Sequence, residues 1–238
     1  GHCGGLTVRG DYIYVAGGGK HCLYVYSYAE AVAAEDRSPL VCKGEFKIEN
    51  EDQSDYLGVA FVTVWDNELV AGEFYREQNY PTPDAHKRVT KSGETNTAMA
   101  VSFAFADGTE GEGETAFGLK KQPSKEISMP GLVQGAYFEN GKAVLSTSYG
   151  VAFSHLYEYD LEKAATGETA KLLGKDLPLY SLDRSSLEMD YKIAPMSEEI
   201  VLAGGKTYVM CESASNKYIF GKFTGAKWCY ATELSKMK

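Results

Sequence analysis

The sequence predicts an all-β protein, and more specifically a β-propeller in which four blades of four strands each can be read. Three observations lead to this prediction. The 238 residues include 17 tyrosines, which favour half-buried strands, and 25 glycines, which favour tight turns. Short apolar stretches alternate with polar turns along the chain. One strand-turn-strand pattern occurs four times in the same internal order, which is typical of propeller blades.

Each repeat begins with a short apolar strand, a polar turn and a second strand, which fall in the segments 5–17, 58–72, 135–146 and 189–211. Asn140 and Gly141 give a strong hairpin signal, because both turn positions require a positive φ. Third strands are expected at 23–26, 99–105, 156–159 and 218–220. Fourth strands are expected to close the repeats at 40–48, 116–120, 171–173 and 227–232.

We therefore expect a single domain over residues 1–238, with blades at about 1–54, 55–130, 131–184 and 185–238. Three of these units have about 54 residues, a length within the range of propeller repeats. The second unit is longer because it carries an insertion at 75–96. A β-sandwich or jelly roll would also have many short strands, but not so long a period with the same order. Two small β domains would require a linker, and no Pro- or Ser-rich linker interrupts the repeats.

The first repeat has glycine and an apolar strand, then a turn, then Tyr-Val-Ala-Gly at 14–17 and Leu-Tyr-Val-Tyr at 23–26. This arrangement resembles the blades of the NHL, YncE and SMP-30-like propeller families, and the resemblance extends over nearly the whole chain at the level of blades. An NHL blade usually has Asp and Asn around its second turn, where this chain has Gly-Gly-Gly-Lys-His at 17–21. The resemblance implies a propeller architecture and no particular activity.

The ends of the chain leave the closure of such a ring open. The sequence enters a strand almost at once and finishes on an expected outer strand. Four blades could close by packing side by side, or a missing N-terminal part or a partner chain could complete the ring. Pairing of two copies is a third arrangement.

Charge and hydropathy limit the classes of function. The formal net charge of −9 disfavours binding to nucleic acid and to anionic membranes, because the chain repels phosphate. The same charge favours a secreted or surface protein, or a protein that binds cations. No apolar stretch approaches the length of a membrane-spanning helix, and no signal peptide is visible. We expect an extracellular or cell-surface location.

Five cysteines occur, at positions 3, 22, 42, 211 and 229. Since no two of them have the C-x-x-C spacing, a zinc ribbon and a thioredoxin-type motif are excluded. Two interpretations remain: buried cysteines that act as small hydrophobic side chains, or one or two disulfides in a secreted protein.

Antiparallel connectivity places two kinds of loop on the same side of every blade: the loops that lead into the first strand and the loops that join strands two and three. We call this side the loop face. All four histidines, His2, His21, His86 and His155, are expected on it. Binding sites of propellers commonly lie where many loops converge, so this face is the predicted ligand-binding face.

The predicted ligand is a carbohydrate, a peptide or a protein. The insertion contributes Tyr and Arg side chains, which are favoured at recognition surfaces. It is expected to project over the loop face. Together with the histidines and the corresponding loops of the third and fourth repeats, the candidate ligand-binding residues are His21, Glu73, Tyr75, Arg76, His86, Tyr149, His155 and Glu212.

Oxygen ligands from several blades around one axis would suit a hard cation such as Ca²⁺. Asp55, Gln134 and Glu188 are expected where the chain enters the first strands of repeats two to four. This set resembles the axial metal site of SMP-30-like propellers, although the full ligand set of that family is not matched. An alternative function is therefore a metal-dependent hydrolase or lyase in which a loop histidine acts as general base. A third hypothesis is a structural subunit whose missing blades come from another polypeptide.

Overall fold

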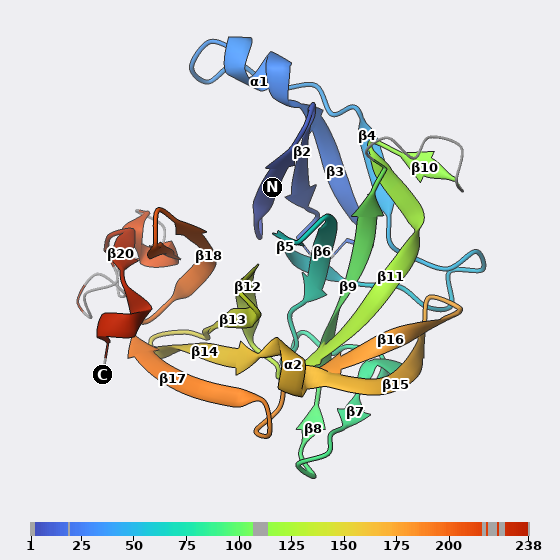
Figure 1. The fold of residues 1–238 in the computed structure, drawn as a ribbon. Helices are drawn as coiled ribbons and strands as arrows, with labels where there is room; N and C mark the ends of the chain where they lie inside the picture. Colours follow the sequence, from blue (N-terminus) through green and yellow to red (C-terminus); the bar gives the residue numbers. More distant parts are fainter. Residues whose placement is uncertain are drawn as a thin grey trace.

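The computed structural model describes residues 3–18, 20–106, 114–215, 218, 223 and 227–237. Strands in several sheets make up most of the described chain, so the predicted all-β class is confirmed (Figure 1). The α-helices α1 (Tyr28–Ala33) and α2 (Leu161–Ala164) are short. Within the described ranges no helix has the length and hydropathy that crossing a membrane requires.

The first sheet is a four-stranded antiparallel meander. Its strands, in spatial order, are β1 (Leu6–Arg9), β2 (Tyr12–Ala16), β3 (Cys22–Ser27) and β4 (Gly44–Lys47). Alternation explains its two faces, because Tyr14 and Val25 are paired and buried, whereas the neighbouring Val15 and Tyr24 are half-buried on the opposite side. The order of these strands is the one expected for the first unit, although β4 begins at Gly44 and not at residue 40.

The second sheet is larger than one predicted unit. Its strands, in spatial order, are β5 (Val59–Trp65), β6 (Glu68–Glu73), β9 (Ala98–Phe105), β11 (Leu119–Met129), β16 (Lys175–Ser181) and β15 (Ala165–Leu172), with β10 (Thr115–Ala116) beside β11. The pair β11–β16 is parallel, whereas the other pairs of this sheet are antiparallel. Residues 171–173, expected to close the third unit, instead belong to the hairpin β15–β16 at the edge of this second sheet.

The third sheet consists of β12 (Val133–Glu139), β13 (Lys142–Thr147), β14 (Ser154–Asp160) and β17 (Leu187–Ile193). The hairpin predicted at Asn140 and Gly141 is confirmed, with both residues at positive φ. The segment of β17 is expected from the sequence to open the fourth unit, yet it forms the outer strand of the third sheet. The strand pairs with β14 along its length, and only Tyr191 of its residues is buried. This burial pattern is that of an edge strand.

The last sheet is built from β18 (Ser197–Ala203), β19 (Lys206–Cys211) and β20 (Tyr230–Thr232). Its first hairpin turns at Gly204 and Gly205, both at positive φ, in a segment for which the sequence predicts a longer turn. The third strand expected at 218–220 lies outside the described residues except for Tyr218.

The insertion at 75–96 has structure of its own. It contains a 3-10 turn η1 (Asp84–His86) and the small hairpin β7 (Arg88–Val89) with β8 (Thr95–Asn96). Two further 3-10 turns, η2 (Glu212–Ala214) and η4 (Leu234–Lys236), follow β19 and β20.

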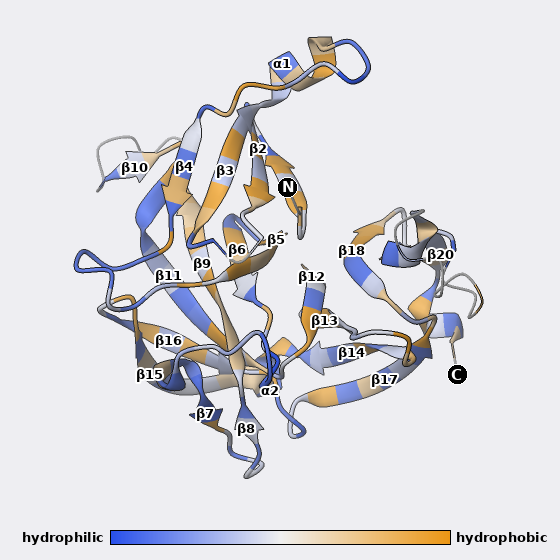
Figure 2. Ribbon diagram, turned by 180° about the vertical axis from the view of Figure 1, so that it is seen from behind, coloured by the Kyte–Doolittle hydropathy of each residue, from blue (hydrophilic) through white to orange (hydrophobic). Residues whose placement is uncertain are grey.

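Three hydrophobic clusters join consecutive sheets. The first sheet packs on the second through residues that include Tyr14, Phe46 and Phe103. The second packs on the third through a cluster with Val70 and Leu145, and Ile200 of β18 packs on the third sheet in the last cluster. Figure 2 shows apolar stretches along β3 and β9, two strands that contribute residues to these hydrophobic clusters.

The first strands of the four sheets, which we call the inner strands, are β1, β5, β12 and β18. Strand β5 contacts β1 and β12, and β12 contacts β18. The first and last sheets approach each other at Gly5, where an added Cβ would come within 2.1 Å of the Glu199 carboxyl group. Leu6 of β1 and Val201 of β18 are nevertheless 55% exposed, so the described residues do not form a closed ring.

Because β12 and β18 approach each other closely at Gly135, replacing this glycine by alanine is expected to destabilise the protein. A Cβ at Gly135 would lie 2.6 Å from the Cα of Glu199, and the φ of Gly135 is not positive. Gly→Ala at an unobstructed position of ordinary φ stabilises by about 0.4–1 kcal/mol. Gly135→Ala is instead expected to lower the free energy of unfolding by about 1–3 kcal/mol, because the two strands must separate. Urea unfolding measures this difference, and an unchanged or more stable variant would show that the strands do not pack so closely.

Candidate functional site

The predicted loop-face histidines have separate partners. His21 stacks on Tyr56 with ring centroids 3.7 Å apart, and His155 pairs with Asp190 at 2.6 Å. His86 is buried in the insertion, and His2 lies outside the described residues. These three described histidines therefore do not converge on one catalytic centre.

His86 lies between two carboxylates, and we call Asp55, Glu73 and His86 the acid–histidine cluster. Its Nδ1 is 2.9 Å from Glu73 Oε1 and its Nε2 is 3.0 Å from Asp55 Oδ1. The second oxygens of both carboxylates accept main-chain N–H groups, from Met99 at 3.2 Å and from Leu173 at 2.6 Å. One imidazole thus connects the insertion to β6, to the segment before β5 and, through Asp55, to the β15–β16 turn.

The electrostatics of this cluster favour a charged histidine. Burial alone would lower the pKa of His86, but the hydrogen-bonded carboxylates of Glu73 and Asp55 outweigh burial and raise that pKa above its ordinary value. A second buried ion pair lies nearby, where Arg88 Nε donates to Glu126 at 2.9 Å. Burial raises the pKa of Glu126, and the Arg88 guanidinium opposes that shift.

The cluster anchors the insertion within the protein, with His86 and Glu73 buried. His86 and Glu73 are only 1% and 2% exposed, so neither belongs to the exposed ligand-binding surface on which we expected them. No local pattern in the sequence indicates that His86 lies between Glu73 and Asp55. These residues are 13 and 31 positions from His86, and their burial depends on the path of the insertion.

Other predicted residues do gather at an exposed surface. The Arg76 guanidinium lies over the ring of Tyr149, 3.9 Å from its centroid. Tyr75 of the insertion packs beside Gly131, and its carbonyl accepts the N–H of Leu132. Arg76 also pairs with Tyr80 through two main-chain hydrogen bonds of 2.9 Å.

The loop between β13 and β14 extends this surface. Tyr149 is 41% exposed and Phe153 is 57% exposed, and Lys192 Nζ lies 4.0 Å from the Phe153 centroid. We call Arg76, Tyr80, Tyr149, Val151, Phe153 and Lys192 the loop-face patch. Arg76 and Tyr149 were expected at a binding surface from the sequence, and the other members were not, although the apolar Val151 and Phe153 within a short loop are a usable signal.

The proposed axial metal ligands are not brought together. Glu188 lies on the outer strand β17, where it pairs with Lys163 at 3.0 Å and with Lys142. Gln134 lies on the inner strand of the same sheet, three strands away, which corresponds to roughly 14 Å. Asp55 is engaged by His86. Among the described residues no group of three His, Cys, Asp or Glu side chains is placed to hold one metal ion.

Two carboxyl groups that were not predicted from the sequence belong to consecutive residues at the start of β18, Glu198 and Glu199. Burial raises the pKa of Glu198 to about 8, and the nearby carboxylate of Glu212 adds to the shift. Burial raises the pKa of Glu199 to about 8 as well, against the opposing effect of main-chain N–H donors. Their signal in the sequence was the apolar run at 200–203 before a Gly-Gly turn, which marks 197–203 as a strand and places both carboxyl groups within it.

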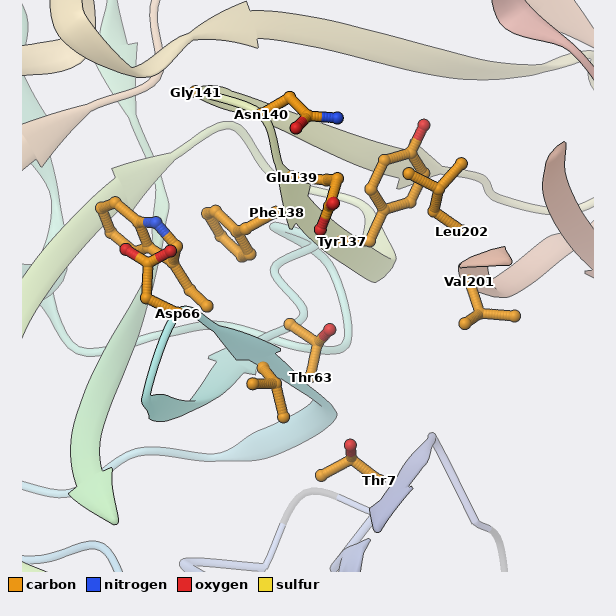
Figure 3. Close-up of a pocket in the computed structure, with 12 residues that line it drawn as sticks. Thr7, Thr63, Asp66, Tyr137, Phe138, Glu139, Asn140, Gly141, Val201 and Leu202 are labelled. Atoms are coloured by element: carbon orange, nitrogen blue, oxygen red, sulfur yellow. The ribbon is translucent and has the colours of Figure 1, made fainter. Parts of the chain in front are cut away.

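A cavity of about 600 Å³ opens on the turn face, which is the side of the inner-strand hairpin turns and lies opposite the loop face. Thr7, Thr63, Tyr137 and Val201, one residue from each inner strand, contribute to its wall. Figure 3 shows side chains from these four strands around the opening, with Asp66 and Asn140 from the turns at its rim. The Tyr137 hydroxyl is fixed by a 2.9 Å hydrogen bond with Thr207.

The cysteines are unpaired. All five lie in the described residues as free thiols, with Cys22 and Cys211 buried and Cys3, Cys42 and Cys229 exposed. Burial raises the pKa of the Cys211 thiol to about 11, which keeps it protonated and unreactive.

Comparisons with known proteins identify no family. No protein-family model matches the chain, and no curated protein sequence does. Among solved structures, the chain is similar to the one titled "Crystal structure of the computationally designed Ika4 protein", at 11% identity over 89% of this chain and 86% of that chain, with a TM-score of 0.33. A TM-score this low supports no conclusion about fold or function.

The acid–histidine cluster predicts a large effect of His86→Ala. The change leaves the buried Glu73 carboxylate without its cation, which is expected to cost about 3–5 kcal/mol in the free energy of unfolding. His21→Ala is the control, because that half-buried side chain has one carboxylate partner, Glu49 at 3.7 Å, which keeps access to solvent, and the change is expected to cost at most about 1 kcal/mol. Equal losses in the two variants would contradict the anchoring role of His86.

The destabilisation caused by His86→Ala is expected to depend on pH. Because the folded pKa of His86 is raised, the stability from its charge is fully present below the unfolded value of about 6.5 and is lost as pH rises through the folded pKa. The difference in unfolding free energy between wild type and His86→Ala is therefore expected to shrink when urea unfolding is repeated at rising pH. A difference that grows with pH would mean that His86 is neutral in the folded state.

Proposed function

We propose that the protein is a propeller-type binding protein whose loop-face patch recognises a protein or peptide ligand. The observation that carries this proposal is the pairing of exposed aromatic rings with cations, Arg76 over Tyr149 and Lys192 over Phe153. The buried acid–histidine cluster supports it indirectly, because this cluster fixes the insertion that supplies Arg76.

The arrangement of the sheets supports the propeller part of the proposal. Four sheets each begin with an inner strand, and these strands contact one another in chain order from β1 to β18. The hydrophobic clusters lie between consecutive sheets, as they do between blades. Loops of different sheets would then share one face, which is a frequent location of binding sites.

The chemistry of the loop-face patch favours a protein ligand over a carbohydrate. A sugar stacks on open aromatic faces, and the cations over Tyr149 and Phe153 leave one face of each ring for such stacking. Exposed Tyr, Phe and Val beside Arg are typical of protein interfaces, where aromatic residues and Arg are enriched. The two cations in a chain of net charge −9 would add specificity for a ligand that presents carboxylates beside apolar side chains.

Selection from a phage-displayed library of random peptides tests this proposal. Peptides enriched on the wild-type protein are expected to bind Tyr149→Ala and Phe153→Ala at least about tenfold more weakly, as measured by biolayer interferometry. Both side chains are exposed, so the unfolding free energy is expected to change by no more than about 0.5 kcal/mol.

Val41→Ala is the matched control, because Val41 is an exposed apolar residue between α1 and β4, on the turn face of the first sheet. Peptide affinity should survive this change. Enriched peptides that bind both patch variants as well as wild type would refute the proposed site. Binding on a glycan array that depends on Tyr149 and Phe153, without peptide enrichment, would instead assign a carbohydrate ligand.

A further inference from the structure

Every sheet of the fold has two faces, and the order of the sheets decides which neighbour each face meets. We call the face that packs on the next sheet along the chain the forward face, and the face that packs on the preceding sheet the backward face. The four inner hairpins share one register when residues are counted from their turns. One position on the second strand of each hairpin therefore lies on the forward face, and it is occupied by Tyr14, Val70, Val144 and Tyr208.

The forward face of the fourth sheet is uncovered. At the position just defined, the residues of the first three sheets belong to the three hydrophobic clusters, one cluster each, and are at most 1% exposed. Tyr208 of the fourth sheet is 38% exposed at the same position. Its neighbours on this face, Val201 and Met210, are 55% and 47% exposed. The fourth sheet thus leaves open an apolar surface of the kind that the other three sheets bury.

The backward face of the first sheet is uncovered in the same way. The equivalent inner-strand residues Val62, Ala136 and Ile200 each belong to one hydrophobic cluster and are at most 3% exposed. Leu6 of the first sheet is 55% exposed at this position, and Val8 on the same face is 43% exposed. Among the described residues, no hydrophobic cluster contains side chains of both the first and the fourth sheet. The two uncovered faces therefore do not cover each other within one chain.

Each contact between consecutive sheets joins one forward face to one backward face. The chain has one face of each kind uncovered, at the two ends of its array of sheets (Figure 1). We propose that a second copy of the chain covers them, with the forward face of the fourth sheet of one copy packed on the backward face of the first sheet of the other. Contiguous exposed apolar residues mark such interaction surfaces in soluble proteins. The contact uses a different face on each copy, and two such contacts close a dimer.

This contact continues across two chains the stacking that joins the sheets within one chain. A second copy is the occupant that the chain favours, because each uncovered face has its complement on that copy. The inference is independent of the loop-face patch, since Leu6, Val8, Val201, Tyr208 and Met210 are not part of that patch.

Sedimentation velocity of two single variants and of their mixture tests the proposal. Leu6→Glu places a charge on the backward face, and Tyr208→Glu places a charge on the forward face. Wild type is expected to sediment as a dimer, and each variant alone is expected to dissociate with a constant at least about tenfold higher. An equimolar mixture of the two variants is expected to associate at least about tenfold more tightly than either variant alone, because it retains one intact face of each kind.

Val89→Glu is the matched control, because Val89 is an exposed apolar residue of β7 that belongs to neither face. Its dissociation constant should equal that of wild type. Circular dichroism identifies a variant that does not fold, and Leu6→Ser or Tyr208→Ser then takes its place. A monomeric wild type, or face variants that associate as tightly as wild type, would overturn the proposal. Folded face variants that do not associate when mixed would also overturn it, since they would show that the contact does not join a forward face to a backward face.

Discussion

The close meeting of four strands around one buried carboxyl group is the constraint on which the arrangement of the sheets depends. Glu199 of β18 accepts an N–H from the third sheet and fills the space beside Gly5 of the first. An isolated buried carboxyl group would be costly, and hydrogen bonds to the backbone offset part of that cost. This contact links sheets that are distant in sequence, whereas the hydrophobic clusters join consecutive sheets.

The two faces of the molecule differ because the chain connects the strands differently on each. On the turn face the inner strands end in two-residue hairpins, which leave the cavity lined by Thr7, Thr63 and Tyr137 open. On the loop face the connections are longer, and the insertion is held by His86 between two carboxylates. Rigid anchoring of that insertion explains how Arg76 can hold a fixed position over an exposed tyrosine, a geometry that a freely moving loop would lose to conformational entropy.

Local patterns in the sequence predicted the strands that pair with their neighbours along the chain. Alternation and the Asn140–Gly141 turn identified the first sheet and the β12–β13 hairpin, because their pairing partners are adjacent in sequence. The parallel pairing of β11 with β16 joins segments about fifty residues apart in sequence, and no local signal encodes it. The same limit applies to the sites: Arg76 and Tyr149 could be selected as residue types suited to recognition, whereas the surroundings of Glu199 and His86 arise only from packing between sheets.

Hydrogen exchange of the Ala136 main-chain amide, followed by NMR, tests whether the third and fourth sheets meet at the Glu199 carboxyl group. Its N–H donates across the two sheets to Glu199, so it should exchange among the slowest amides in the protein, because this bond opens only when those sheets separate. An Ala136 amide that exchanges as fast as the amides of the exposed loop at 149–153 would contradict this arrangement.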